Sequence, residues 1–437
     1  MLKLYEVSKF QKIEHYKMGI YQIPTLISLK NNKNNMILQY KCVTDLEKPD
    51  NIPRGGYGLV IFYQNTQNEN DNLAMKLLNE KYITEIKESN MDSFYKEEEF
   101  FKLLNHKLDT DDKLKGCKGN LIEFITSDNY NYDGVDYYFI LLKKMDMDLN
   151  SYLYNLKHGV FDVNLDTAKK IIYQIAKSLD CLHKLGYVYN DLKPENILIN
   201  KNGECRLTDF NCVTEINDNS RFRSCSTRTF RSPEQVKKSR YGNSPLIDSW
   251  QLGLLILCIL TKNTKSIIHI ISEEKEEDYK YVINNLNKKQ LDYYLSLCQS
   301  HYLELENKKQ YNLLKNMIYD LLNKNIKKRI DISKLLTNDF FDFNTKNSSH
   351  SRKLSMKSKT NLNKTSSSVV IKKSIKATNI NKKGKTLKNK KVMAGNCIFP
   401  FKYKGKEYNQ CVKDDIEGDW CATSLTDRGY TKTKGFC

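Results

Sequence analysis

Three polar residues suited to phosphoryl-transfer chemistry, Asp191, Lys193 and Asn196, lie within six positions of one another. A fourth, Asp209, follows thirteen residues after Asn196. Transfer of a phosphoryl group to a hydroxyl needs carboxylate and amide ligands for Mg²⁺, and a carboxylate that receives the hydroxyl proton. These residues could supply both. Any one of them alone could belong to an ordinary solvated turn, so the prediction depends on their surroundings.

Two upstream segments could bind the phosphates of a nucleotide. The segment Gly55 to Val60 reads Gly-Gly-Tyr-Gly-Leu-Val, and glycines let backbone amides approach phosphate oxygens closely. A strand-like segment, Ala74 to Lys76, ends on a lysine, and the helix-like segment 93–107 carries Glu97. The glycine cluster alone is a weak signal. It gains weight from the lysine and the glutamate that follow it in this order.

The segment from Tyr189 to Asn196 strongly resembles the catalytic loop of eukaryotic-type protein kinases. Asp209 to Asn211 is similar to the Asp-Phe-Gly element of that family, Ser232 to Glu234 to its Ala-Pro-Glu element, and Asp248 to its buried helix aspartate. The resemblance implies an enzyme that uses ATP and Mg²⁺ to phosphorylate protein substrates. Lys193 favours serine and threonine over tyrosine as acceptors.

The resemblance also implies a role for each site residue. Asp191 would orient the substrate hydroxyl and accept its proton, and Lys193 would steady the γ-phosphate. The implied ATP-binding residues are Gly55, Gly58, Val60, Ala74, Lys76, Glu97, Leu142, Met145 and Leu198; the implied Mg²⁺ ligands are Asn196 and Asp209; the implied substrate-loop residues are Thr227, Glu234 and Arg329. Glu234 and Arg329 are expected to form a buried ion pair.

One of these assignments, that of Glu97, depends on the register of the helix. Glu98 is an alternative to Glu97 as the partner of the lysine, although Glu97 leaves Phe101 one turn on, on the same helix face. Leu142 would be the gatekeeper beside the adenine. Residues 143–145 would form the hinge between the lobes.

The sequence departs from the kinase pattern at several positions. Tyr189 and Asn190 replace the usual His-Arg, and Tyr189 is expected to stack under Phe210. Asn190 cannot bind a phosphate as arginine does, so activity is expected not to require phosphorylation of the activation loop. Asn211 replaces a glycine, which asparagine is expected to tolerate because it visits positive φ readily. Pro53 replaces the first glycine of the hairpin and is expected to stiffen it.

Fold and catalytic competence are separate questions, because pseudokinases keep the fold. The residues Lys76, Glu97, Asp191, Asn196 and Asp209 are all present, which favours activity. The rival interpretation is a catalytically silent scaffold that presents a C-terminal ligand-binding module.

The predicted fold class is α+β, a bilobal kinase fold followed by a disordered basic linker and a small disulfide-rich module. The smaller, mainly β lobe is expected to end near Lys143 and the larger helical lobe near Phe343. The predicted divisions are an N-terminal extension at 1–49, a kinase domain at 50–343, a linker at 344–395 and a terminal module at 396–437.

The net charge of +19 is concentrated in one stretch. Residues 344–395 hold 15 of the 71 Lys and Arg and no acidic residue, whereas residues 1–343 hold 49 basic and 46 acidic residues. No specific nucleic-acid partner is therefore predicted for the globular part. The stretch has three interpretations: a solvated spacer, a nuclear-targeting run around 382–391, or an electrostatic tether to anionic membranes or nucleic acid. The spacer is the simplest.

The cysteines fall into two groups. Eight are scattered through the first 300 residues without metal-ligand spacing, and we expect these to be thiols. Four lie in the last 41 residues, which closely resemble a fibronectin type II module. The resemblance implies disulfides that join Cys397 to Cys421 and Cys411 to Cys437, and an aromatic pocket for a collagen-like chain or a choline-type headgroup. A zinc site is disfavoured, because no two of the four have the two-residue spacing that such sites prefer.

The compartment is not fixed by these patterns. The first thirty residues are interrupted by charges and predict no signal peptide. The longest apolar run, Leu252 to Leu260, is about half of the roughly 20 residues that a membrane helix needs, so it predicts a buried helix and no transmembrane segment. The kinase domain predicts a cytoplasmic or nuclear location, and the cysteine-rich module leaves an extracellular one open.

Overall fold

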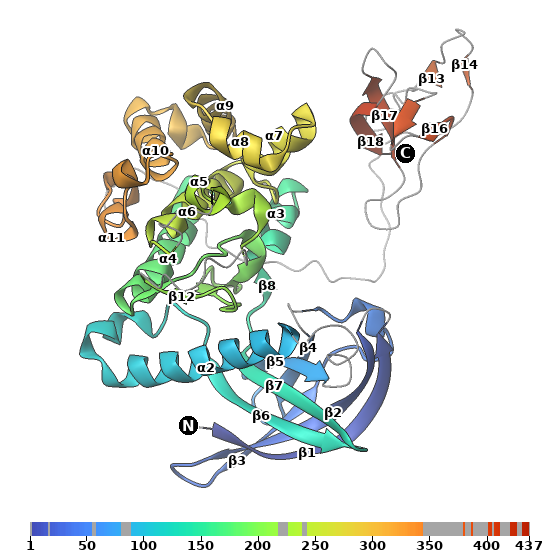
Figure 1. The fold of residues 1–437 in the computed structure, drawn as a ribbon. Coiled ribbons are helices and arrows are strands. Elements are labelled where there is room, and N and C mark those ends of the chain that lie inside the picture. The colour runs from blue at the N-terminus through green and yellow to red at the C-terminus, as the bar shows by residue number, and fades with distance from the viewer. Residues whose placement is uncertain are drawn as a thin grey trace, which may run out of the picture. The chain divides into compact units, whose positions relative to one another are not determined.

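The chain divides into two compact units, residues 1–356 and 357–437, which are described separately. The computed structural model describes the following parts of the chain: 2–15, 18–54, 58–79, 89–216, 226–237 and 243–343 in the first unit, and 379–380, 386–387, 401–403, 406–410, 420–425 and 431–436 in the second. The first unit has two lobes (Figure 1).

The smaller lobe is built on a seven-stranded antiparallel sheet (Figure 1). In spatial order its strands are β1 (Leu2–His15), β2 (Gly19–Asn31), β3 (Ile37–Cys42), β4 (Leu59–Asn65), β5 (Asn72–Asn79), β7 (Val135–Lys143) and β6 (Phe124–Tyr132). Side chains alternate between the two faces. Leu59, Ile61 and Tyr63 on β4 are buried, whereas Val60 and Phe62 between them are half-buried.

Residues 2–42 are integral to this sheet. Leu26–Lys30 of β2 pair with β3, and Tyr40–Cys42 of β3 pair with β4. The ring of Phe10 on β1 lies 4.5 Å from that of Tyr132 on β6, so the first and last strands of the sheet meet. The sheet thereby curls around a hydrophobic core of its own, which includes Tyr21, Ile23, Ile27, Leu29, Tyr40, Leu59, Ile61 and Tyr63.

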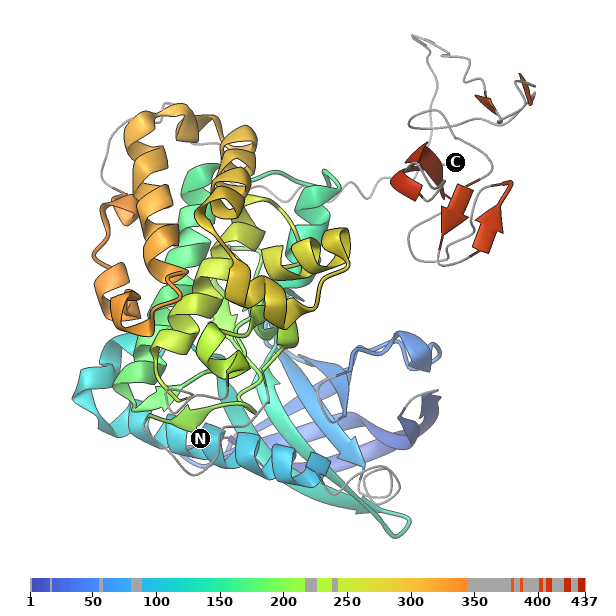
Figure 2. The same cartoon turned by 45° about the horizontal axis from the view of Figure 1, so that its top comes forward.

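The helix α2 (Ser89–Thr110) runs beside the sheet of the smaller lobe, next to the larger lobe (Figures 1 and 2). Its apolar stripe packs into a separate core. Phe94, Phe101 and Leu104 on this stripe are buried, at helical spacing. The 3₁₀ segment η2 (Asp112–Cys117) follows α2. Further 3₁₀ turns are η1 (Pro49–Asn51), η3 (Pro194–Asn196), η4 (Arg228–Phe230), η5 (Leu303–Glu306), η6 (Ile326–Lys328) and η7 (Asp339–Phe341).

The larger lobe is mainly helical. Its helices are α3 (Leu149–Lys157), α4 (Leu165–Lys184), α5 (Pro233–Val236), α6 (Leu246–Leu260), α7 (Ile267–Lys275), α8 (Tyr279–Asn285), α9 (Lys288–His301), α10 (Lys308–Leu321) and α11 (Ile332–Leu335). Its short strands are β8 (Met147–Asp148), β9 (Tyr187–Val188), β10 (Ile197–Ile199), β11 (Cys205–Leu207) and β12 (Thr214–Glu215).

Helix α6 lies in the middle of this lobe, and every side chain from 247 to 260 is buried. The apolar run predicted to be a buried helix, Leu252 to Leu260, forms the second half of α6. Among the helices of the described residues, none combines the length and the apolar character needed to span a bilayer.

The prediction that the first eight cysteines are thiols is wrong in part. Cys117 in η2 and Cys181 in α4 form a disulfide, and Cys212 is also disulfide-bonded. The first pair is 64 residues apart, and only the packing of η2 against α4 brings the two sulfurs together. The described cysteines with free thiols are Cys42, Cys205, Cys258 and Cys298. Cys225 lies outside the described residues.

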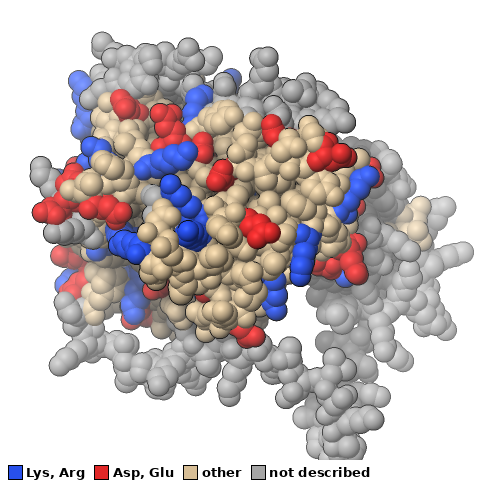
Figure 3. Space-filling model, turned by 90° about the horizontal axis from the view of Figure 1, so that it is seen from below, with Lys and Arg blue, Asp and Glu red and all other residues tan. Residues whose placement is uncertain are grey.

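The surface of the described residues carries charges of both signs. On the face in Figure 3, Lys and Arg side chains lie among Asp and Glu side chains, with large areas of neither. This mixture agrees with the nearly equal numbers of basic and acidic residues before position 344.

The described residues of the second unit form three short antiparallel pairs. They are β13 (Asn379–Ile380) with β14 (Thr386–Leu387), β15 (Phe401–Tyr403) with β16 (Lys406–Tyr408), and β17 (Trp420–Leu425) with β18 (Thr431–Phe436). Cys421 lies on β17, opposite Gly435 of β18. Cys397, Cys411 and Cys437 lie outside the described residues, as does most of the predicted linker. The predicted disulfides therefore stay predictions.

Replacement of Ile27 by alanine should destabilise the smaller lobe, because this β2 side chain is fully buried in the core inside the curled sheet. Removing buried methylenes leaves a cavity and lowers the free energy of unfolding by about 2–5 kcal/mol. The matched change Ile20→Ala alters a β2 side chain that is 45% exposed, and should shift this free energy by less than about 0.5 kcal/mol. Urea unfolding followed by circular dichroism measures both. Equal decreases in the free energy of unfolding for Ile27→Ala and Ile20→Ala would contradict the burial of Ile27.

Candidate active site

A buried ion pair joins the sheet to helix α2. The Nζ of Lys76 on β5 lies 2.6 Å from Oε1 of Glu97 on α2, and Glu97 is completely buried. The same carboxylate oxygen accepts a hydrogen bond of 3.2 Å from the backbone N–H of Phe210. Glu98, the alternative partner, instead pairs with Lys102 at 2.8 Å on α2 itself. The ion pair therefore connects the sheet, α2 and the segment that begins at Asp209.

The charge of Lys76 is maintained by its neighbours. Burial alone would lower the pKa of Lys76, but the carboxylates of Glu97 and Asp209 outweigh burial and raise this pKa above its ordinary value. The side chain is therefore a fixed ammonium group, which is the form that attracts phosphate oxygens.

Asp191 lies at the centre of a second cluster. Its Oδ2 is 2.8 Å from Nζ of Lys193, and its Oδ1 accepts hydrogen bonds from the backbone N–H and the hydroxyl of Thr227, at 2.7 and 2.8 Å. Lys193 also donates to the hydroxyl of Thr227, at 2.9 Å. Residues 36 positions apart thus form one network around a carboxylate that is 5% exposed.

Asn196 and Asp209 offer oxygen atoms beside this cluster. The side-chain amide of Asn196 donates to the backbone carbonyl and to Oδ2 of Asp191, at 2.9 and 3.1 Å, which leaves its own carbonyl oxygen to serve as a ligand. Burial raises the pKa of Asp209, and the carboxylates of Glu97 and Asp191 raise it further, against the opposing effect of Lys76. A divalent cation would offset this repulsion between carboxylates.

This donor set fits Mg²⁺. Magnesium is commonly held by one or two carboxylates together with the phosphates of the substrate, rather than by a cage of protein ligands. The described ranges contain no group of three or more His, Cys, Asp and Glu side chains arranged to hold a metal by themselves. One carboxylate, Asp209, and one amide, Asn196, are the candidate ligands.

The catalytic loop is fastened to α6 by two buried side chains. The carboxylate of Asp248 accepts hydrogen bonds of 2.8 Å from the backbone N–H groups of Tyr189 and Asn190. Gln251 accepts from the N–H of Leu192 at 2.8 Å and donates to the carbonyl of Asn190 at 2.7 Å. Sequence reasoning identified Asp248 but missed Gln251, whose position three residues after Asp248 on one helix face was the available signal.

Tyr189 occupies the position of the usual histidine. It contacts Phe210 as expected, although the two rings meet edge to face rather than stacked, and its hydroxyl makes a contact that the sequence did not predict. Its ring centroid lies 5.9 Å from that of Phe210, which in turn lies 5.2 Å from that of Phe101 on α2. Its hydroxyl donates to the backbone carbonyl of Thr208, directly before Asp209. Tyr189 therefore packs beneath Phe210 and also holds the segment that carries Asp209.

Asn190 and Asn211, which replace other residues of the kinase pattern, both donate hydrogen bonds from their side-chain amides. Asn190 has a φ of 70° and donates to the carbonyl of Cys212 at 3.2 Å and to the hydroxyl of Thr214 at 2.8 Å. Asn211 donates to Oδ1 of Asp209 at 2.6 Å. The expectation of a positive φ at Asn211 is wrong, because among the described residues of this segment the positive φ falls at Asp209, at 59°.

The predicted adenine-binding residues lie on adjoining strands and the segment between the lobes. Val60 pairs with Lys76, and Ala74 pairs with Leu142, so these four positions are neighbours in the sheet. Val60 and Ala74 are half-buried and Leu142 is buried. Half-buried Met145 follows β7, and half-buried Leu198 lies on β10 of the larger lobe.

Of the two predicted hairpin glycines, only Gly58 lies within the described residues. Gly55 lies outside the described residues. Gly58 is packed against β5, where a Cβ atom would lie 2.1 Å from the carbonyl oxygen of Leu77. The need for glycine at 58 therefore comes from this close approach of two strands.

Glu234 and Arg329 form the ion pair expected between the substrate loop and the larger lobe. Their two nitrogen–oxygen distances are 2.5 and 3.1 Å, and both side chains are buried. Arg329 also donates to the carbonyl of Leu246 at 2.8 Å, at the start of α6. The loop that carries Thr227 is thereby tied to the same helix that holds the catalytic loop.

The chain belongs to the protein kinase family. The model of the protein kinase domain matches residues 46–341, and that of the fibronectin type II domain matches residues 397–437. Both predicted families are therefore confirmed. The kinase match includes the larger lobe and strands β4 to β7 of the smaller lobe, whereas β1 to β3 precede it.

Curated relatives are protein kinases of several kinds. The chain is 40% identical over 120 residues to an Aurora kinase from Saccharomyces cerevisiae, which is 27% of this chain and 32% of the relative. It is 33% identical over 118 residues to a cyclin-dependent kinase 4 homolog from Caenorhabditis elegans, with 27% and 28% covered. It is 28% identical over 214 residues to a cAMP-dependent protein kinase catalytic subunit from Dictyostelium discoideum, with 48% and 28% covered. The chain thus matches about a third or less of each relative.

Phosphatase treatment of the purified protein should leave its kinase activity within about twofold, because Asn190 links the catalytic loop to Thr214 without a phosphate group. Mass spectrometry would verify that the phosphate has been removed, and the phosphatase would be inhibited before the assay. Loss of most activity on treatment, with recovery after incubation with ATP, would contradict this expectation.

Proposed function

We propose that this chain is an ATP-dependent protein kinase that transfers the γ-phosphoryl group to serine and threonine hydroxyls of protein substrates. The observation that carries the proposal is the buried pair of Lys76 and Glu97, which also binds the backbone of Phe210 beside Asp209. A buried ion pair is weak evidence for stability, because desolvation opposes the attraction between its charges. Its position next to carboxylate and amide oxygens favours a role in nucleotide binding.

The proposed mechanism assigns one task to each group. Lys76 binds the phosphates of ATP through its fixed positive charge, and Asn196 and Asp209 would hold Mg²⁺, which when bound neutralises charge on the phosphate oxygens. Asp191 accepts the proton of the attacking hydroxyl. In this structure the hydroxyl of Thr227 donates to Asp191, so the carboxylate already has the geometry to accept from an alcohol. Lys193, 2.8 Å from Asp191, is placed to stabilise charge on the transferred group.

We propose specificity for serine and threonine because of the contacts that Lys193 makes with Asp191 and Thr227. The lysine bridges Asp191 and Thr227, which positions the substrate loop close to the proton acceptor. An acceptor hydroxyl on a short side chain must come close to Asp191. Phosphoamino-acid analysis of a phosphorylated peptide library would distinguish this specificity from tyrosine specificity.

The changes Lys76→Met and Asp191→Asn should each lower kcat by at least about 100-fold, because each removes a charge that phosphoryl transfer uses. Incorporation of labelled phosphate from ATP into a protein substrate measures the effect. The matched controls are Lys118→Met and Asp109→Asn, whose side chains are 73% and 66% exposed and form a surface pair. These controls should retain wild-type rates. Equal incorporation by the wild type and by Asp191→Asn would instead favour a silent scaffold.

For the terminal module we propose an oxidised fibronectin type II fold that binds a collagen-like chain or a choline-type headgroup. The family match to residues 397–437 supports this proposal. So small a unit buries little apolar surface, and relies on disulfides for stability.

Thiol labelling with mass spectrometry should find Cys397 joined to Cys421 and Cys411 joined to Cys437. Retention of the full chain on gelatin or choline resin should be lost after reduction of these disulfides. Four free terminal thiols in the purified protein would count against the proposed pairing, and unchanged retention after reduction would count against the proposed link between fold and binding.

A further inference from the structure

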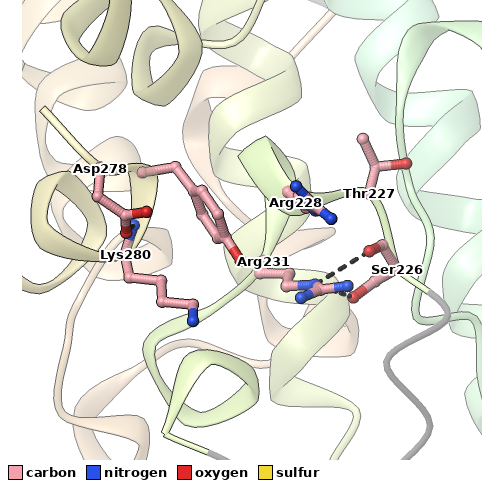
Figure 4. Close-up of a pocket in the computed structure, with 7 residues that line it drawn as sticks. Ser226, Thr227, Arg228, Arg231, Asp278 and Lys280 are labelled. Carbon is pink, nitrogen blue, oxygen red and sulfur yellow. Dashed lines mark hydrogen bonds between the residues drawn. The ribbon is translucent and has the colours of Figure 1, made fainter. Parts of the chain in front are cut away.

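A polar cavity of about 570 Å³ opens beside the proposed active site (Figure 4). It lies between the loop that follows Ser226 and the start of α8, and Thr227 is part of its lining. Three cationic side chains line it, those of Arg228, Arg231 and Lys280, against one carboxylate, that of Asp278. The cavity therefore has an excess of positive charge.

Two of the three cationic side chains that line the cavity have no ion-pair partner within the described parts of the chain. Arg228 and Lys280 are exposed, and neither forms an ion pair with any residue that the structure describes. The one lining carboxylate, Asp278, accepts a hydrogen bond of 2.8 Å from the backbone N–H of Lys280 and so caps α8. An anion that entered the cavity would therefore meet, in Arg228 and Lys280, two cations that form no ion pair with a described carboxylate.

The loop that carries the two arginines is held in place. The Nε of Arg231 donates to the carbonyl and hydroxyl oxygens of Ser226, at 3.0 and 3.2 Å (Figure 4). Gln235 donates to the same hydroxyl at 3.3 Å, and the hydroxyl of Ser266 donates to the carbonyl of Thr229 at 2.8 Å. Fixed contacts of this kind lower the ordering cost of binding a ligand.

The cavity lies next to Asp191, the proposed proton acceptor. Thr227 lines the cavity and its hydroxyl lies 2.8 Å from Oδ1 of Asp191. An extended peptide advances about 3.3 Å per residue. A side chain within about four residues of the acceptor hydroxyl, and hence about 13 Å along the peptide, can therefore reach this cavity.

We propose that Arg228, Arg231 and Lys280 select protein substrates that carry an anionic side chain within about four residues of the acceptor hydroxyl. The inference rests on the proposed kinase function and specifies its substrates. Carboxylate and phosphate share the required chemistry, since both accept charge-assisted hydrogen bonds from guanidinium and ammonium groups. Arg228 and Lys280 act on substrate recognition and take no part in the transfer step.

The test uses peptides built around one serine, with Glu, Gln or phosphoserine placed in turn at each of the four positions on either side. The Glu peptide should exceed its Gln counterpart in kcat/KM by about tenfold at the best position, a difference of about 1.4 kcal/mol. The phosphoserine series shows which anion is preferred. The advantage should shrink at high salt, because the cationic side chains are exposed.

Charge reversal tests the assignment to these residues. Lys280→Glu and Arg228→Glu should each lower the Glu-to-Gln ratio of kcat/KM several-fold and favour a peptide with lysine at the same position. Lys275→Glu, an exposed change of equal charge on α7 outside the cavity, should leave the ratio as in the wild type. A ratio near one in the wild type, or a ratio that Lys280→Glu and Arg228→Glu leave unchanged, would overturn the proposal.

Binding of the labelled peptides, followed by fluorescence anisotropy, separates this proposal from the proposed function. Tighter binding of the Glu peptide that is lost in Lys280→Glu supports the cavity even when no peptide is phosphorylated, in which case the kinase proposal alone fails. Equal binding of the Glu and Gln peptides, together with equal turnover, overturns the cavity proposal and leaves the kinase proposal standing.

Discussion

The carboxylate of Asp248 holds the catalytic loop in place. It is completely buried on α6 and accepts backbone N–H bonds from Tyr189 and Asn190, while Nε2 of His183 lies 2.8 Å from it. Asp191 directly follows these two anchored residues. Because α6 is buried along its length, the position of Asp191, the proposed proton acceptor, depends on the core of the larger lobe.

A second carboxylate, that of Glu97, connects the two lobes. It binds Lys76 from the sheet and the backbone of Phe210 from the larger lobe, and it is itself carried on α2. A movement of α2 would therefore alter the lysine and the segment beside Asp209 together. The edge-to-face contacts of Phe210 with Phe101 and Tyr189 lie in the same region and connect this arrangement to the core.

The order of chemical groups along the chain was enough to predict the family and the bilobal fold. This order could not predict contacts between segments that lie far apart in the sequence and meet only in the folded chain. The meeting of Phe10 with Tyr132 joins strands more than 100 residues apart, and the Cys117–Cys181 disulfide depends on how η2 packs against α4. The positive φ expected at Asn211 lies instead two residues earlier, at Asp209.

The curling of the small-lobe sheet has a consequence for solubility. A sheet edge offers unpaired N–H and C=O groups to which a strand from another molecule can add. Here the two outermost strands, β1 and β6, face each other through Phe10, Tyr130 and Tyr132, and the hydroxyl of Tyr130 donates to the carbonyl of Gln22 on β2 at 2.8 Å. The aromatic contact covers the two edges where β1 and β6 meet, and there it hinders the addition of a strand from another molecule.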